Sequence, residues 1–95
     1  MKAYELLAEP RHWTKGAYSR LGTDGVANVM VGNMWCVVGA IWRCYGRVPY
    51  QWPSGYLHLG ELVKKRFGHS SLTNWNDSSL TTHADVVSVL KELDL

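Results

Sequence analysis

The residues best suited to catalysis in this sequence are a cysteine, a histidine and an aspartate that lie far apart along the chain. The Cys36 thiol becomes a nucleophile for acyl transfer when a nearby histidine accepts its proton. His83 is the candidate base, with His12 as the alternative. Asp77 or Asn76 would orient the imidazole. These residue types allow a small Cys/His-dependent hydrolase or transferase with Cys36, His83 and Asp77 as its catalytic set.

Whether Cys36 is reactive depends on where its helix begins. A thiol in the first turn of a helix has a lowered pKa, whereas a thiol buried among apolar side chains has a raised pKa and is inert. A helix that starts at Asn33 gives the first arrangement, and a helix that starts at Asn28 gives the second. The long apolar run around Cys36 favours the second, so we expect a structural cysteine and a protein that is not an enzyme.

The histidines do not predict a metal site. Their spacing matches no zinc motif, and no two of them lie at i and i+4 on one expected helix. They are His12, His58, His69 and His83. The sequence also has no Gly-rich phosphate loop and no nucleophile elbow. We therefore expect neither a bound metal nor a cofactor.

A second group of candidate residues is aromatic and lies in a loop stiffened by prolines. Tyr50, Trp52 and Tyr56 are interleaved with Pro49 and Pro53. Exposed aromatic side chains are common anchors in protein interfaces. The prolines restrict the chain before binding, which lowers the entropy cost of ordering it. We interpret the three aromatics as binding residues; in the alternative, Trp52 folds back to cover the core.

The segment Trp75-Asn76-Asp77 has two interpretations. Asn and Asp side chains commonly hydrogen-bond the backbone of tight turns, and a tryptophan beside them would fill the core. In that case the segment braces the fold. In the alternative it is a loop that faces a ligand, so Trp75, Asn76 and Asp77 are further binding candidates.

The charge and hydropathy of the chain exclude some partners. The formal net charge is +2, which is low for a nucleic-acid-binding domain. The dense basic run Lys64-Lys65-Arg66 is expected on the solvated face of a helix, and a nucleic-acid surface that adds Arg43 and Arg47 is the alternative. The uncharged segment 26–42 has 17 residues, fewer than the roughly 20 of a membrane-spanning helix. We expect no membrane insertion.

The two cysteines indicate a reducing compartment. Cys36 and Cys44 are eight residues apart, which on one helix is a rise of about 12 Å. A disulfide needs Cα atoms within about 7 Å of each other, so these two cannot pair. Unpaired thiols are typical of the cytosol, and residues 1–5 show no signal-peptide pattern. We expect a cytoplasmic protein.

The elements that must position these residues are mostly helices. The 95 residues suit one domain, 1–95, and 46% of them are hydrophobic. Helices are expected at residues 2–8, at residues 29–45, from an N-cap at Ser54 to Gly68, and from an N-cap at Thr82 with Asp85 three residues on. Because the segment 29–45 is apolar on every side, it is expected to be a buried central helix. Residues 46–55 and 69–81 are expected to be loops.

The predicted fold class is therefore mainly α, a small bundle of about four helices around the central helix. Near residues 17–31 a short β-hairpin is the alternative to irregular structure, with strands at 17–21 and 26–31. Asp24 and Gly25 would form its turn. Within the central helix, Gly39 would allow a neighbouring helix to approach closely.

Three segments of the chain, in order, resemble an uncharacterised bacterial and phage family, a domain of unknown function. They are Trp13-Thr14-Lys15-Gly16-Ala17, then Trp35-Cys36-Val37-Val38-Gly39-Ala40-Ile41 with its Trp-Cys-x-x-Gly-Ala pattern, then Trp75-Asn76-Asp77 followed by Thr82, Asp85 and Val86. The sequence departs from the family pattern at Thr81, where an arginine is usual. The resemblance implies a mainly helical fold, a bacterial or phage source and no particular activity.

Taken together, these features favour a small cytosolic binding or regulatory protein of bacterial or phage origin, located in the bacterial host cytosol if phage-encoded. It would act through contact with a protein partner or with a second copy of itself. The Cys/His-dependent enzyme is the alternative, and a nucleic-acid binder is the third hypothesis.

Overall fold

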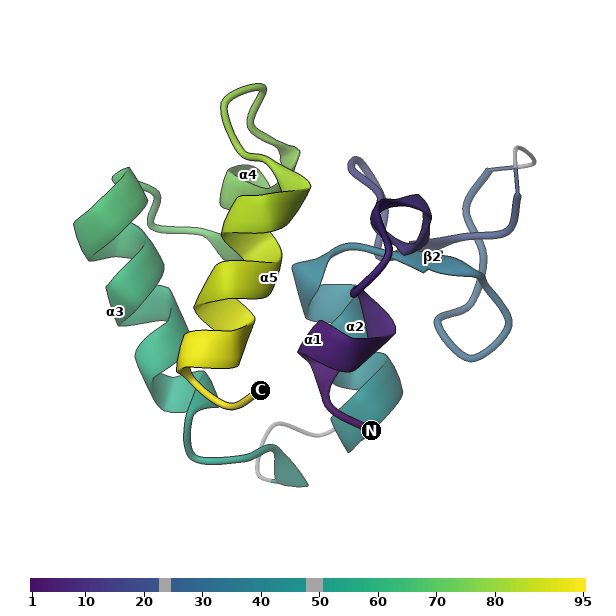
Figure 1. Cartoon of the computed structure of the whole chain (residues 1–95). Coiled ribbons are helices and arrows are strands. Elements are labelled where there is room, and N and C mark those ends of the chain that lie inside the picture. The colour runs from purple at the N-terminus through teal and green to yellow at the C-terminus, as the bar shows by residue number, and fades with distance from the viewer. Residues whose placement is uncertain (23–24, 48–50) are drawn as a thin grey trace.

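The computed structural model describes residues 1–22, 25–47 and 51–95, which are mainly helical with one small antiparallel sheet (Figure 1). In chain order, the elements are α1 (Ala3–Leu6), the 3-10 helix η1 (Pro10–His12), β1 (Ser19–Arg20), β2 (Met34–Trp35), α2 (Val37–Tyr45), α3 (Tyr56–Phe67), α4 (Leu72–Asp77) and α5 (His83–Glu92). In Figure 1, α3 and α5 lie on one side of the molecule and the sheet with its loops lies on the other. The predicted fold class, mainly α, is confirmed.

The core gathers around α2, α3 and α5. Val37, Ala40 and Ile41 of α2 are fully buried, as are Leu59 and Val63 of α3 and Val86 and Leu90 of α5. α2 packs against α1 and α4, α5 packs against α1, and α3 packs against α4. The apolar stripes that recur along each helix are therefore the surfaces that the helices bury against one another.

The prediction of one continuous buried helix over residues 29–45 is wrong in its first half. α2 begins at Val37, and Met30 is 62% exposed. Asn28 closes a turn instead, because its Oδ1 accepts a hydrogen bond from the Met30 N–H at 2.9 Å. A side-chain acceptor of this kind competes with helix formation. In this stretch Met30 and Val31 are exposed although Val29 and Trp35 are buried, so apolar composition alone does not predict burial.

The predicted hairpin between residues 17–21 and 26–31 is correct in its first strand only. β1 pairs in antiparallel register with β2, which lies later in the chain than the predicted partner. Among the described residues, a single bridge joins Arg20 to Val26. Asp24, predicted to lie in the turn, falls outside the described residues.

Gly32 explains how the intervening segment is held next to β1. Its backbone lies so close to Ser19 that a Cβ would come within 1.9 Å of the Ser19 Oγ. The Asn33 N–H then donates to the Arg20 carbonyl at 2.9 Å. These contacts place the following residues in β2, and α2 therefore begins only after that strand.

Local capping sets the other helix boundaries. α3 ends at Gly68, as predicted, and the φ of 77° there is the left-handed conformation that glycine adopts most readily. Its N-cap is Gly55 rather than the predicted Ser54. The predicted capping box of α5 is present, because Thr82 and Asp85 each accept from the other's backbone N–H at 3.1 Å.

The prediction of a loop over residues 69–81 missed a short helix. α4 occupies Leu72–Asp77, and Ser71 caps it by accepting from the Asn74 N–H at 3.3 Å. The helix has only six residues and is rich in polar residues, so it carries little helical periodicity. Its stability comes from the burial of Trp75 rather than from propensity.

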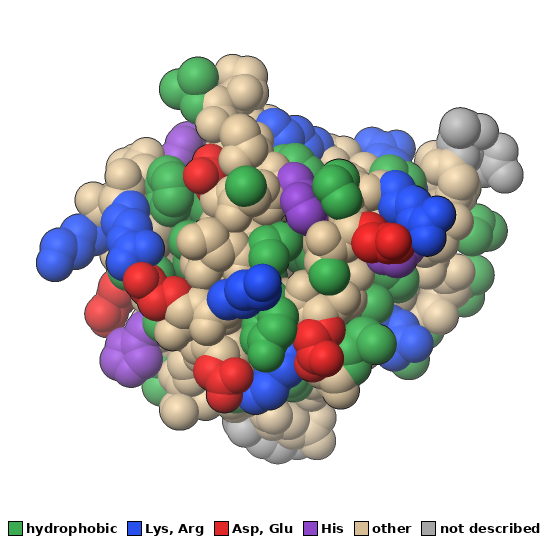
Figure 2. Space-filling view, viewed as in Figure 1, with side chains coloured by type: hydrophobic (Ala, Val, Ile, Leu, Met, Phe, Trp, Pro, Cys, Tyr) green, Lys and Arg blue, Asp and Glu red, His purple; other side chains and the backbone are tan. Residues whose placement is uncertain are grey.

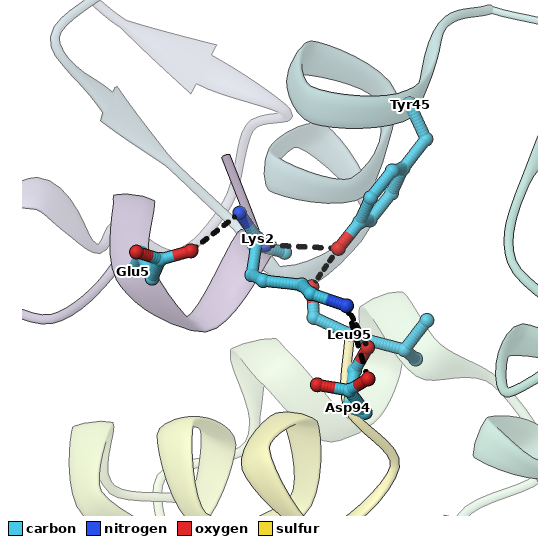
Figure 3. A network of polar contacts seen from close by, with 6 residues as sticks. Lys2, Glu5, Tyr45, Asp94 and Leu95 are labelled. Atoms are coloured by element: carbon cyan, nitrogen blue, oxygen red, sulfur yellow. Dashed lines mark hydrogen bonds and ion pairs between the residues drawn. The ribbon is translucent and has the colours of Figure 1, made fainter.

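A polar network joins the first and last residues of the sequence to the end of α2 (Figure 3). The Tyr45 hydroxyl donates to the Leu95 backbone oxygen, and burial raises the pKa of this hydroxyl. The Lys2 ammonium lies 3.0 Å from an Asp94 carboxylate oxygen, and that hydrogen bond raises the pKa of Lys2. Glu5 accepts from the Lys2 backbone N–H at 2.9 Å. The network fixes α1 against α2 and the end of α5.

Candidate functional site

Cys36 is the N-cap of α2, next to the first turn in which the reactive interpretation placed it. Its Sγ accepts a hydrogen bond from the Gly39 N–H at 3.3 Å. The residue is nevertheless only 2% exposed. Burial raises the pKa of the thiol, and its effect outweighs the opposing effect of the Gly39 N–H. The thiol is therefore protonated at neutral pH, which is unfavourable for a nucleophile.

A hollow of about 340 Å³ lies beside Cys36. The residues that line it are Gly16, Ala17, Tyr18, Val26, Cys36, Thr73 and Asp77. The structure thus brings together Cys36 and Asp77 of the predicted catalytic set. The Asp77 carboxylate accepts from the Gly16 N–H at 2.9 Å, and its negative charge adds to the raised pKa of Cys36.

The predicted histidine bases do not line this hollow. His83 Nε2 lies 2.5 Å from the Leu7 carbonyl oxygen, and because a carbonyl only accepts, this nitrogen must carry the proton. The His83 ring also packs beside Trp13, with 6.1 Å between ring centroids. His12 contacts the edge of Trp35 at 6.5 Å. The lining of the hollow therefore places a carboxylate, but no imidazole, near the Cys36 thiol.

Asn76 is a hub that connects three separate parts of the chain. Its Oδ1 accepts from the Trp13 indole N–H at 2.7 Å and from the Val37 N–H at 3.0 Å. Its Nδ2 donates to the Thr14 carbonyl at 2.9 Å and to Asp77 at 3.1 Å. Both lone pairs and both amide protons of this fully buried side chain are therefore used within the protein.

Trp75, the residue before this hub, is also fully buried and packs against Phe67 with 5.1 Å between ring centroids. Neither the Trp75 side chain nor the Asn76 side chain reaches the surface of the molecule. Of the three residues Trp75, Asn76 and Asp77, only Asp77 is exposed. In this segment, Asp77 alone presents polar atoms to a ligand.

The predicted aromatic anchors Trp52 and Tyr56 are half-buried and pack against the core. Their rings meet edge to face with centroids 4.3 Å apart. The Trp52 indole N–H donates to the Gly46 carbonyl at 2.6 Å. Tyr50 and Pro49 lie outside the described residues. Both described rings therefore combine contact with the core and some access to solvent.

Sequence reasoning missed a group of exposed apolar side chains in the segment that runs from just before β1 toward β2. Its members, called here the apolar lobe, are Tyr18, Leu21, Val26, Met30 and Val31. Figure 2 shows hydrophobic side chains at the edge of the molecule where this segment lies in Figure 1. The available signal was the density of turn-forming residues, since Gly22, Gly25, Asn28, Gly32 and Asn33 all fall among these apolar positions.

A second hollow, of about 350 Å³, lies between the apolar lobe and the C-terminal end of α2. Its lining consists of Asn28, Val29, Met30, Trp42, Arg43, Gly46 and Arg47. The Arg47 guanidinium lies 5.5 Å from the centroid of the Trp42 ring, and Tyr18 contacts the same indole edge to face at 6.2 Å. Tyr18 thus borders the first hollow and supports the wall of the second.

Residues 1–22, 25–47 and 51–95 also bear on two further classes of site, a metal centre and a membrane-spanning segment. No group of three His, Cys, Asp or Glu side chains in these ranges is arranged to hold a metal ion. None of the helices there has the length and apolar character needed to cross a membrane.

Comparison with known proteins places the chain in a family. No curated protein and no solved structure matches it. The sequence profile described as "Family of unknown function (DUF6197)" matches residues 1–93. The bacterial or phage source implied by the earlier resemblance stays a prediction. The match spans nearly the whole sequence, and the chain therefore belongs to the DUF6197 family of unknown function.

Proposed function

We propose that this chain is a small binding protein that recognises a protein partner through the apolar lobe. One observation carries the proposal. Among the described residues, eight large apolar side chains are exposed, and five of them lie within residues 18–31. Val26 is 78% exposed and Met30 is 62% exposed. Contiguous exposed apolar surface is uncommon on small soluble domains and is typical of interaction sites.

Backbone hydrogen bonds hold the described part of the apolar lobe against β1 in the absence of a partner. The Leu21 N–H donates to the Gly25 carbonyl at 3.3 Å, and the Ala27 N–H donates to the Ser19 carbonyl at 3.0 Å. Preorganisation of this kind lowers the entropy cost of association. The apolar lobe thus presents its side chains on a backbone that needs little rearrangement.

The contacts of Cys36 favour a binding role over thiol catalysis. Its Sγ accepts a backbone hydrogen bond, its pKa is raised, and the hollow beside it contains no histidine. A cysteine nucleophile needs a base or a lowered pKa. The apolar lobe needs neither, because its surface is already in the form that a partner would contact.

The proposal is tested by affinity capture from a lysate of the source organism with quantitative mass spectrometry. Met30→Ser and Val26→Ser should each reduce the yield of proteins that the parent chain enriches. Leu80→Ser is the matched control, because Leu80 is 87% exposed but lies outside the apolar lobe. Equal enrichment by all four proteins would contradict the proposal. Thermal melts of the variants verify that each is folded.

A further inference from the structure

We infer that the partner contacts the hollow beside Trp42 with an acidic segment, in which a carboxylate adjoins a large apolar side chain. The carboxylate would pair with Arg43 and Arg47, and the apolar side chain would lie between Met30 and Trp42. This inference rests on the proposed function and names the chemistry of the partner at one end of the apolar lobe.

The walls of the hollow provide both kinds of contact. Met30 contributes an exposed flexible thioether, and Trp42 contributes a half-buried indole. The Arg47 guanidinium lies over that indole, with its central carbon 5.5 Å from the ring centroid. A planar guanidinium in this position can accept a carboxylate through two parallel hydrogen bonds.

The charge of this region is unbalanced within the protein. Three surface cations have carboxylate partners, Lys2 with Asp94, Arg11 with Glu9, and Arg66 with Glu92. Several others, Lys64 and Lys65 among them, have none within the described residues. Within the described ranges, Arg43 and Arg47 make no such pair. The sequence gives the reason, because no Asp or Glu occurs anywhere in residues 25–60.

The helix dipole of α2 explains the position of one of these arginines but not of the other. Arg43 lies in the last turn of α2, where a cation is favoured by the helix dipole. Arg47 follows the end of the helix and is placed by the Trp42 ring instead. Two unpaired guanidiniums that converge on one hollow are complementary to an anion.

An acidic protein segment fits this site better than nucleic acid does. Nucleic-acid affinity comes mainly from several simultaneous phosphate contacts. Only two cations line this hollow, while Val29, Met30 and Trp42 make most of its wall apolar. Lys64 and Lys65 lie on α3, outside the hollow, so they do not extend it into a basic surface.

The test uses two short peptides with blocked ends, one of alternating glutamate and leucine and one in which glutamine replaces each glutamate. Binding is followed by NMR at the Met30 methyl group and the Trp42 indole N–H. The glutamate peptide should bind about tenfold more tightly, as expected when a charge-assisted pair is gained. The double variant Arg43→Gln/Arg47→Gln should remove this preference. The control Lys64→Gln/Lys65→Gln removes the same charge elsewhere and should retain it.

Several outcomes would overturn the inference, and they separate it from the proposed function. Equal binding of both peptides, lost in Met30→Ser, would leave an apolar docking surface without acid recognition. A preference that survives in Arg43→Gln/Arg47→Gln would place the acid elsewhere. Tighter binding of a single-stranded DNA oligonucleotide at the same signals would identify a nucleic-acid surface. Absence of both peptides from the hollow would reject the inference, while lysate capture tests the proposed function independently.

Discussion

α2 has a hollow at each end, and the two ends differ in how the protein satisfies the polar groups around them. At the N-terminal end, the Cys36 thiol and the buried Asn76 amide have hydrogen-bond partners inside the protein. At the C-terminal end, Arg43 and Arg47 have no carboxylate partner within the described residues. Buried polar groups are normally hydrogen-bonded, whereas exposed charges need no partner. The Cys36 and Asn76 side chains therefore serve stability, and the two guanidiniums are open to a partner. Cys36, a familiar catalytic residue type, therefore lies at the end whose buried polar side chains already have partners within the protein.

Asn76→Ala should cause the largest loss of stability. The substitution leaves the Trp13 indole N–H, the Val37 N–H and the Thr14 carbonyl without their partner. Each buried unsatisfied group costs about 1–3 kcal/mol, so the free energy of unfolding should fall by roughly 3 kcal/mol or more. Urea unfolding followed by tryptophan fluorescence measures this change.

The matched control for Asn76 is Asn74→Ala on the same short helix. Asn74 is exposed, so its substitution should change stability by less than about 0.5 kcal/mol. Equal midpoints for the two variants would show that the N-terminal end of α2 is not the structural brace described above.

Gly39→Ala should have the next largest effect, because Gly39, in the first turn of α2, lies against the backbone of Tyr18, the residue that precedes β1. A Cβ at this position would come within 1.9 Å of the Tyr18 carbonyl oxygen. Gly39 therefore contacts the backbone that leads into β1, whereas the sequence suggested contact with another helix. Relief of this contact requires a backbone shift, which should cost about 1–3 kcal/mol. Tyr18 borders the first hollow, so the variant should also perturb its NMR signals.

Gly60→Ala is the control with the opposite sign. Gly60 lies within α3, and a Cβ there would meet no atom within 4 Å. Replacing a helical glycine with alanine in open space should stabilise the protein by roughly 0.5–1 kcal/mol. A stability loss in Gly60→Ala, or none in Gly39→Ala, would contradict the assigned packing. Thermal unfolding of both variants decides this.

Cys36→Ala should have a moderate effect, a loss of roughly 1 kcal/mol through the small cavity that it creates. Iodoacetamide should label Cys36 in the native protein slowly at neutral pH, because burial raises the thiol pKa from its ordinary value of 9.0. Mass spectrometry of the labelled peptides measures the rate. Rapid labelling would restore the enzyme hypothesis for the N-terminal end of α2.

The raised pKa of Cys36 also sets the direction of a pH effect. As the pH rises, the unfolded thiol ionises before the folded one. Its contribution to stability is therefore complete below pH 9.0 and decreases as the pH rises through the folded pKa. Cys36→Ala should accordingly lose less stability than the parent protein between neutral and alkaline pH.

Features that depend on neighbouring residues were predictable from the sequence. The capping box at Thr82 and Asp85 and the glycine end of α3 at Gly68 are encoded within a few positions. The brace at Asn76 was anticipated as one of two interpretations, although its partners Trp13 and Val37 are distant in the chain.

Features that depend on long-range contact were not predictable in the same way. Residues 29–33 are apolar enough for a core helix, but the contact between Gly32 and Ser19 holds them in a loop. The separation of His83 from the hollow beside Cys36 likewise follows from its hydrogen bond to Leu7, which no spacing pattern reports. The apolar lobe was missed because exposed and buried apolar residues look alike in one sequence.

The smallest expected effect is that of Arg43→Gln/Arg47→Gln on stability. If these guanidiniums are open to a partner, their removal forfeits the contact between Arg47 and the Trp42 ring and the interaction of Arg43 with the helix dipole. Each interaction is exposed and screened by salt and is worth about 0.5 kcal/mol, so the free energy of unfolding should fall by about 1 kcal/mol or less. A loss comparable to that of Asn76→Ala would show that the two ends of α2 are alike. Denaturant unfolding of the double variant and of Asn76→Ala, measured side by side, therefore gives the difference in stability between the two ends of α2.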